Sequence, residues 1–133
     1  MVSTLSDNAS PLRALVVDDD SAARHHICQA LTRKGIEVRT CSSLSQGRKF
    51  FNSQPIVLAR SPGAGGAEFN GFVDWVREHA GRSQPYIVAI DDEASDAEDA
   101  MASAAANPGC NAVMPSPEDE GAMEERLTAI FNQ

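Results

Sequence analysis

Lysine is nearly absent from this chain of 133 residues: Lys34 and Lys49 are the only two. Aromatic residues make up 5% of it, and no apolar run approaches the ~20 residues that a membrane-spanning helix needs. Basic residues are outnumbered, since 11 Lys and Arg stand against 19 Asp and Glu for a net charge of −8. Such a chain repels nucleic acid and anionic membranes at long range. The sequence therefore argues against a membrane protein and against direct binding to either polyanion.

Cysteine is also scarce, and the three that occur are Cys28, Cys41 and Cys110. Their odd number and the lack of a CxxC motif exclude a disulfide framework and a cysteine zinc site, and they are typical of small buried residues in a reducing cytoplasm. Residues 1–11 carry neither a basic nor an apolar stretch, so we do not expect them to be a signal peptide. We expect a flexible leader over 1–11 and one cytoplasmic domain over 12–133.

What is present is a regular alternation of short apolar stretches with helical patterns. We expect helices after each stretch, with Gly35 and Gly81 ending two of them. Strands separated by helices pair in parallel with right-handed crossovers, which predicts a single-domain, doubly wound α/β fold with five strands and five helices. The predicted strands are residues 12–17, 36–40, 56–59, 86–90 and 111–114.

Local signals refine this pattern. Ser21 is a suitable N-cap for a helix over 22–34, and Ser42 or Ser43 for the next helix. The third helix should bury one apolar face. That face consists of Phe69, Phe72, Val73 and Val76.

Three carboxylates, Asp18, Asp19 and Asp20, follow the first predicted strand. In open parallel sheets, ligands bind beyond the carboxyl ends of the strands. Clustered carboxylates at that edge suit a hard cation such as Mg²⁺. The alternative is that they are solvated loop residues and helix caps.

The stretch 15–24, LVVDDDSAAR, resembles the opening of the receiver domain of two-component response regulators. The helix ending at Gly35 and the Gly109-Cys110-Asn111-Ala112 segment before the last strand match the same family, so the resemblance covers about residues 12–131. It implies a flavodoxin-like (βα)5 fold with strand order 2-1-3-4-5. It also implies a regulatory, non-enzymatic role in cytoplasmic phosphorelay signalling.

In an active receiver of this family, an acidic pair holds Mg²⁺ and an aspartate after the third strand accepts the phosphoryl group. Asp18 and Asp19 match the acidic pair. The acceptor position falls on Arg60, or on Ser61 in a shifted frame, and no Asp occurs between residues 20 and 74. A guanidinium within a covered strand would be costly to bury, which favours Arg60 at the mouth beyond the strand.

The remaining family positions are also altered. Asp91 or Asp92 stands where a Thr or Ser should bind the phosphate, and Ser116 or Met114 stands in place of the lysine. An acyl phosphate needs a carboxylate nucleophile, a metal and cationic groups around the moving oxygens. The resemblance is therefore to a degenerate receiver, or pseudo-receiver. It requires no cofactor and binds Mg²⁺ weakly at best, because a third carboxylate ligand is missing.

Arg60 offers a substitute for the metal. A guanidinium close to Asp18 and Asp19 would neutralise them and form an internal ion pair that locks one conformation. The alternative is a surface arginine that points to water.

We expect a protein-protein interaction module that forms the N-terminal part of a larger signalling protein. It would dock other signalling proteins, or a second copy of itself, through its fourth and fifth helices. One alternative is a phosphorylatable receiver with an atypical acceptor, Asp91 or Ser61. Another is a small-ligand-binding domain on the same fold, for which the sequence reveals no clear apolar lining. The acidic run 91–99 is a solvated loop or a patch for a basic partner.

Overall fold

The computed structural model describes residues 12–61, 67–91 and 109–115, together with Gly121, Glu124, Glu125, Leu127 and Thr128. The predicted leader over 1–11 lies outside these residues. Five strands form one parallel sheet in the order β2-β1-β3-β4-β5, which confirms the expected number, direction and order. The strands are β1 (Arg13–Val17), β2 (Glu37–Cys41), β3 (Ile56–Ser61), β4 (Tyr86–Asp91) and β5 (Ala112–Pro115).

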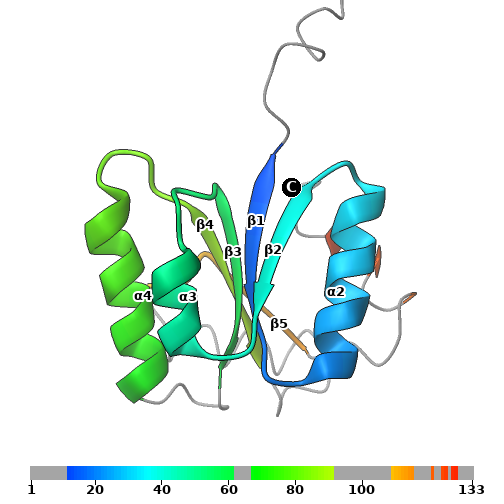
Figure 1. The fold of residues 1–133 in the computed structure, drawn as a ribbon, viewed down its shortest axis with the longest axis horizontal. Helices are drawn as coiled ribbons and strands as arrows, with labels where there is room; N and C mark the ends of the chain where they lie inside the picture. Colours follow the sequence, from blue (N-terminus) through cyan, green and yellow to red (C-terminus); the bar gives the residue numbers. More distant parts are fainter. Residues whose placement is uncertain are drawn as a thin grey trace, which may run out of the picture.

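Helices cover both faces of the sheet (Figure 1). Helix α2 (Ser21–Arg33) lies on one face, and α3 (Leu44–Phe50) and α4 (Ala67–Ala80) lie side by side on the other. No helix in this part of the chain is long and apolar enough to cross a membrane. The alanine-rich helix predicted up to residue 106 lies outside the described residues. The five described residues from 121 onward are helical, so the full count of five helices stays a prediction.

Each face of the sheet has its own hydrophobic core, because alternate residues of a strand point to opposite faces. The core under α2 contains Ala14, Val16, Ile27, Ala30, Leu31, Ile36, Ile56, Leu58, Val88, Ile90, Met114 and Leu127. The core under α3 and α4 contains Leu15, Val17, Cys41, Val57, Ala59, Phe69, Phe72, Val73, Val76, Ile87 and Ala89. The four residues predicted for the apolar face of the third helix are the buried residues of α4.

The helix ends follow local chemistry, with one correction. Ser21 was expected to cap the first helix, but it is the first helical residue and Asp20 is the N-cap. The Asp20 carboxylate accepts hydrogen bonds from the backbone N–H groups of Ala22 and Ala23, at 3.0 and 3.1 Å. A carboxylate is the stronger acceptor, and its charge also favours the positive end of the helix.

The other predicted ends are confirmed. Ser43 caps α3 by accepting from the backbone N–H of Gln46 at 3.1 Å. Gly35 and Gly81 follow α2 and α4 with positive φ angles of 81° and 61°, a conformation that side chains with a Cβ resist.

Gly47 allows α3 to lie close to the sheet. A Cβ atom built at this position would lie 2.9 Å from Phe72 Cε1 and 3.0 Å from Val17 Cγ2. Real Cβ atoms do not approach other carbons so closely, so a side chain here would push α3 away from α4 and β1. The position of α3 against the sheet therefore depends on this glycine.

We predict that Gly47→Ala lowers the free energy of unfolding by about 1–3 kcal/mol, because it overpacks the core under α3. Gly71→Ala is the matched control. A Cβ at Gly71 has only Arg48 Nη2 as a neighbour, at 3.7 Å, and that variant should gain about 0.5–1 kcal/mol from helix propensity. Urea unfolding of both variants tests this, and a stabilising effect of both would contradict the packing argument.

Candidate functional site at the carboxyl edge of the sheet

The acidic residues after β1 lie at the carboxyl edge of the sheet, beside β3. Val17 at the end of β1 pairs with Ala59 of β3, so the next residue of each strand, Asp18 and Arg60, lie next to each other. Strand order reverses at this point, since β1 lies between β2 and β3. In doubly wound sheets this switch point is the usual place for a ligand site.

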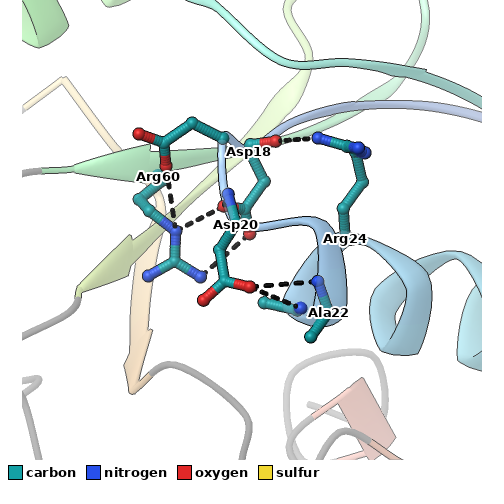
Figure 2. A network of polar contacts seen from close by, with 7 residues as sticks. Asp18, Asp20, Ala22, Arg24 and Arg60 are labelled. Carbon is teal, nitrogen blue, oxygen red and sulfur yellow. Dashed lines mark hydrogen bonds and ion pairs between the residues drawn. The ribbon is translucent and has the colours of Figure 1, made fainter.

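Asp18 and Arg60 form a bidentate ion pair (Figure 2). Arg60 Nε donates to Asp18 Oδ1 at 2.5 Å, and Nη2 donates to Oδ2 at 2.9 Å. The Asp18 carboxylate is fully buried, and the Arg60 side chain is only 8% exposed. The ion pair expected from the sequence is therefore present, and the alternative of an arginine pointing to water is wrong.

The position of Arg60 in the strand corrects one expectation. The apolar pattern predicts a third strand that ends at residue 59, with Arg60 beyond it. In the structure β3 continues through Ser61, and Arg60 pairs with Ile90 of β4. The cost of burying Arg60 is offset by its partner, Asp18. A guanidinium bound at two atoms by a carboxylate is tolerated in a covered strand, whereas an unpaired one is not.

Two further contacts hold Asp18 in place. The backbone N–H of Asp20 donates to Asp18 Oδ1 at 2.9 Å, and Arg24 Nη1 of α2 donates to the Asp18 carbonyl oxygen at 2.6 Å. Figure 2 shows the Arg24 and Arg60 guanidiniums on opposite sides of Asp18. The turn from β1 into α2 is therefore bound to α2 through Arg24 and to β3 through Arg60.

The three adjacent carboxylates have different surroundings. Asp18 is buried against Arg60, whereas the Asp19 side chain is 80% exposed and its Oδ1 lies 4.0 Å from Arg60 Nε. Asp20 points to the start of α2, where the Ala23 N–H, opposed by partial burial, holds the pKa of its carboxyl below the usual value of 3.8. Asp20 therefore fits the alternative that these carboxylates are helix caps, whereas Asp18 forms the ion pair with Arg60.

The other positions named by the resemblance are only partly described. Ser61 and Asp91 are register partners at the ends of β3 and β4, and both are buried. By alternation they lie on the sheet face opposite to Arg60, the face that α3 and α4 cover. Met114 is buried in the core under α2. Asp92 and Ser116 lie outside the described residues.

Carboxylates are suitable ligands for Mg²⁺, but the arrangement around Asp18 does not fit the ion. Both Asp18 oxygens are bound by Arg60, which leaves Asp19 as the available carboxylate of the pair. Within the described ranges, no three His, Cys, Asp or Glu side chains gather as a metal site would require. A divalent cation would have to displace the guanidinium from Asp18.

The same edge holds a cavity that sequence reasoning missed. Its volume is about 610 Å³, and it lies between the end of β1 and the starts of α3 and α4. Its lining includes Asp19, Arg48, Arg60 and Glu68. These residues come from four separate segments, so no local pattern in the sequence could reveal that they meet.

We predict that Arg60→Met lowers the free energy of unfolding by about 3–5 kcal/mol, because it leaves the buried Asp18 carboxylate without its cation. Adding Asp18→Asn should recover most of this loss, since the double variant buries no charge. Urea unfolding of the two single variants and the double variant measures the coupling.

Lys34→Met is the control for that cycle. Lys34 Nζ lies 3.6 Å from Glu124 Oε2, and the two side chains are 28% and 34% exposed. Loss of this partly exposed pair should cost less than about 1 kcal/mol. If Arg60→Met costs no more than Lys34→Met, the buried pair does not stabilise the fold.

We predict that Asp20→Ala costs about 1 kcal/mol at neutral pH, because α2 loses its N-cap. The folded state lowers the pKa of Asp20, so the contribution of its charge is complete above 3.8 and is lost as the pH falls below that value. The difference in stability between wild type and Asp20→Asn should therefore shrink on acidification. Urea unfolding between neutral and acidic pH checks this, with Asp74→Asn on the exposed side of α4 as control.

Comparisons of the amino-acid sequence with protein families and with curated proteins gave no match.

Solved structures, by contrast, match the fold over nearly the whole chain. A response regulator from Thermotoga maritima is 18% identical with a TM-score of 0.66, and the match covers 94% of this chain and 100% of that one. The chemotaxis response regulator CheY4 of Vibrio cholerae is 16% identical with a TM-score of 0.65, over 91% and 99% of the two chains. An atypical orphan response regulator is 19% identical with a TM-score of 0.64, over 90% and 95%. The chain therefore has the fold of response regulator receiver domains.

Proposed function

We propose that this chain is a receiver-like regulatory domain of two-component signalling that acts without being phosphorylated. The observation that carries the proposal is the buried ion pair between Arg60 and Asp18. It puts a permanent positive charge beside the first residue of the acidic pair, where the resemblance calls for a metal and a phosphoryl acceptor.

The chemistry of phosphoryl transfer supports this reading. A guanidinium stays protonated and carries no nucleophilic oxygen, so Arg60 cannot form an acyl phosphate. Ser61 and Asp91 are the other candidate acceptors, and both are buried and adjacent in the sheet. A phosphoryl group there would add negative charge beside Asp91 in a site sheltered from water, which is unfavourable.

A structural neighbour offers a parallel. The structure of the atypical orphan response regulator is described as revealing a phosphorylation-independent regulatory mechanism. This chain shares its fold at 19% identity. We propose a comparable independence here, with the guanidinium of Arg60 in the role that Mg²⁺ plays elsewhere. Mg²⁺ would then bind weakly or not at all.

The output of such a domain is contact with other proteins. We propose that it serves, without enzymatic activity, as the N-terminal part of a larger cytoplasmic signalling protein and docks a signalling partner or a second copy of itself. The family's usual partner surface, the fourth and fifth helices, falls mainly outside the described residues. The net charge of −8 favours a basic protein surface as partner over nucleic acid or membrane.

We predict that Mg²⁺ and then beryllofluoride, a mimic of an aspartyl phosphate, leave the amide resonances of Asp18, Asp19 and Arg60 unchanged in a ¹H–¹⁵N NMR titration. Incubation with acetyl phosphate should also leave the mass of the protein unchanged. Arg60→Asp is the matched variant, because it removes the cation and places a third carboxylate beside Asp18. In that variant Mg²⁺ should shift the same resonances.

Two results would contradict the proposal. Stable phosphate incorporation into wild type, at Ser61 or Asp91 for example, would show a working receiver with an atypical acceptor. A folded Arg60→Asp variant that ignores Mg²⁺ would show that Arg60 is not what keeps the ion away.

A further inference from the structure

We propose that the cavity between β1, α3 and α4 is a binding site for a small zwitterion that carries a carboxylate, an ammonium group and a short aliphatic part. This goes beyond the proposed function and does not rest on it. The cavity measures about 610 Å³, enough for a molecule of amino-acid size. The charges on its walls determine the class of ligand.

Arg48 of α3 provides the positive wall. Its side chain is half-buried, with Cζ 6.0 Å from the centre of the Phe72 ring. Within the described residues the Arg48 guanidinium makes no hydrogen bond and no ion pair, although it lines the cavity. A guanidinium held against an aromatic ring with free donors is suited to a carboxylate.

Serine hydroxyls lie on the same side as Arg48. Ser43 and Ser45 line the cavity next to the start of α3. Ser43 Oγ accepts from the Gln46 N–H, which leaves its hydroxyl hydrogen available to a ligand. Ser45 is exposed, and its hydroxyl makes no hydrogen bond in the described part of the chain. Both hydroxyls can add neutral donors for a ligand carboxylate.

Two carboxylates provide the negative wall. Asp19 is 80% exposed and Glu68 is exposed in the first turn of α4, and both line the cavity. Arg60 pairs with Asp18 and also lies 4.0 Å from Asp19 Oδ1, so one positive charge is shared by two carboxylates. With Glu68, this part of the lining keeps a net negative charge. An ammonium group is the complementary partner there.

Apolar side chains also contribute to the lining. They are Val17, Leu44 and Phe69. A ligand with only a negative charge would meet Asp19 and Glu68, and one with only a positive charge would meet Arg48. A small zwitterion satisfies both kinds of charge. Val17 and Phe69 are buried in the core, so the aliphatic part of the ligand would contact mainly the half-buried Leu44.

The test uses three probes that share one branched carbon skeleton. L-Leucine carries both charges, 4-methylpentanoate carries only the carboxylate, and 3-methylbutylamine carries only the ammonium group. Each is titrated into the ¹⁵N-labelled full chain at constant ionic strength. The amide resonances of Gly47, Asp19 and Phe69 report on the cavity, and resonances at the opposite end of the sheet serve as reference.

We expect saturable shifts with L-leucine at millimolar concentration, and affinity at least ~10-fold weaker for each single-charge analogue. Arg48→Gln should weaken the binding of L-leucine ~10-fold and leave the binding of 3-methylbutylamine unchanged. Glu68→Gln should weaken the binding of 3-methylbutylamine and should not weaken the binding of 4-methylpentanoate. Arg82→Gln, an exposed arginine in the turn after α4, is the matched control and should bind like wild type.

The proposal is overturned if none of the probes shifts these resonances up to ~20 mM, or if all three bind equally, which would indicate only an apolar surface. It is also overturned if a folded Arg48→Gln variant binds L-leucine like wild type. The comparison of probes uses the wild-type protein, so it stands even if a variant fails to fold. Failure here leaves the Mg²⁺ and beryllofluoride results untouched, so the two proposals fail separately.

Discussion

The buried ion pair between Asp18 and Arg60 is the contact on which the arrangement of this sheet edge depends. Neither charge could be buried alone without a large cost in free energy. Together they close the carboxyl ends of β1 and β3, and the Asp18 carboxylate also receives the backbone N–H of Asp20. The consequence is that the Asp18 charge is balanced within the fold by Arg60.

The pair also separates the roles of three neighbouring carboxylates. Asp18 faces inward to Arg60, Asp20 turns to cap α2, and Asp19 is mostly exposed, with its Oδ1 4.0 Å from Arg60 Nε. A run of like charges would normally repel itself, but here each side chain has a different environment. This allows a compact turn between β1 and α2 despite three consecutive acidic residues.

The two sides of this sheet edge differ in how many of their polar groups remain accessible to a ligand. Around Asp18 the hydrogen-bonding capacity is used by Arg60, Arg24 and the backbone. Towards α3 and α4, the cavity leaves Arg48, Asp19 and Glu68 in contact with solvent. The Asp18 carboxylate is thus bound by Arg60, while Arg48 and Glu68, which line the same cavity, add side chains that take no part in that ion pair.

The amino-acid sequence alone determined the elements and their faces, because these follow from local periodicity and helix-end chemistry. The buried face of α4, the turn at Gly35 and the five strand positions could all be predicted from it. It also showed that no aspartate is available near β3. Only the tertiary structure decided that Arg60 is buried within β3 and bound to Asp18, that Asp20 rather than Ser21 caps α2, and that Arg48 and Glu68 line one cavity. Asp18 and Arg60 are 42 residues apart, and the register between two strands brings them together. That register results from packing across the whole sheet, which no local stretch of sequence contains.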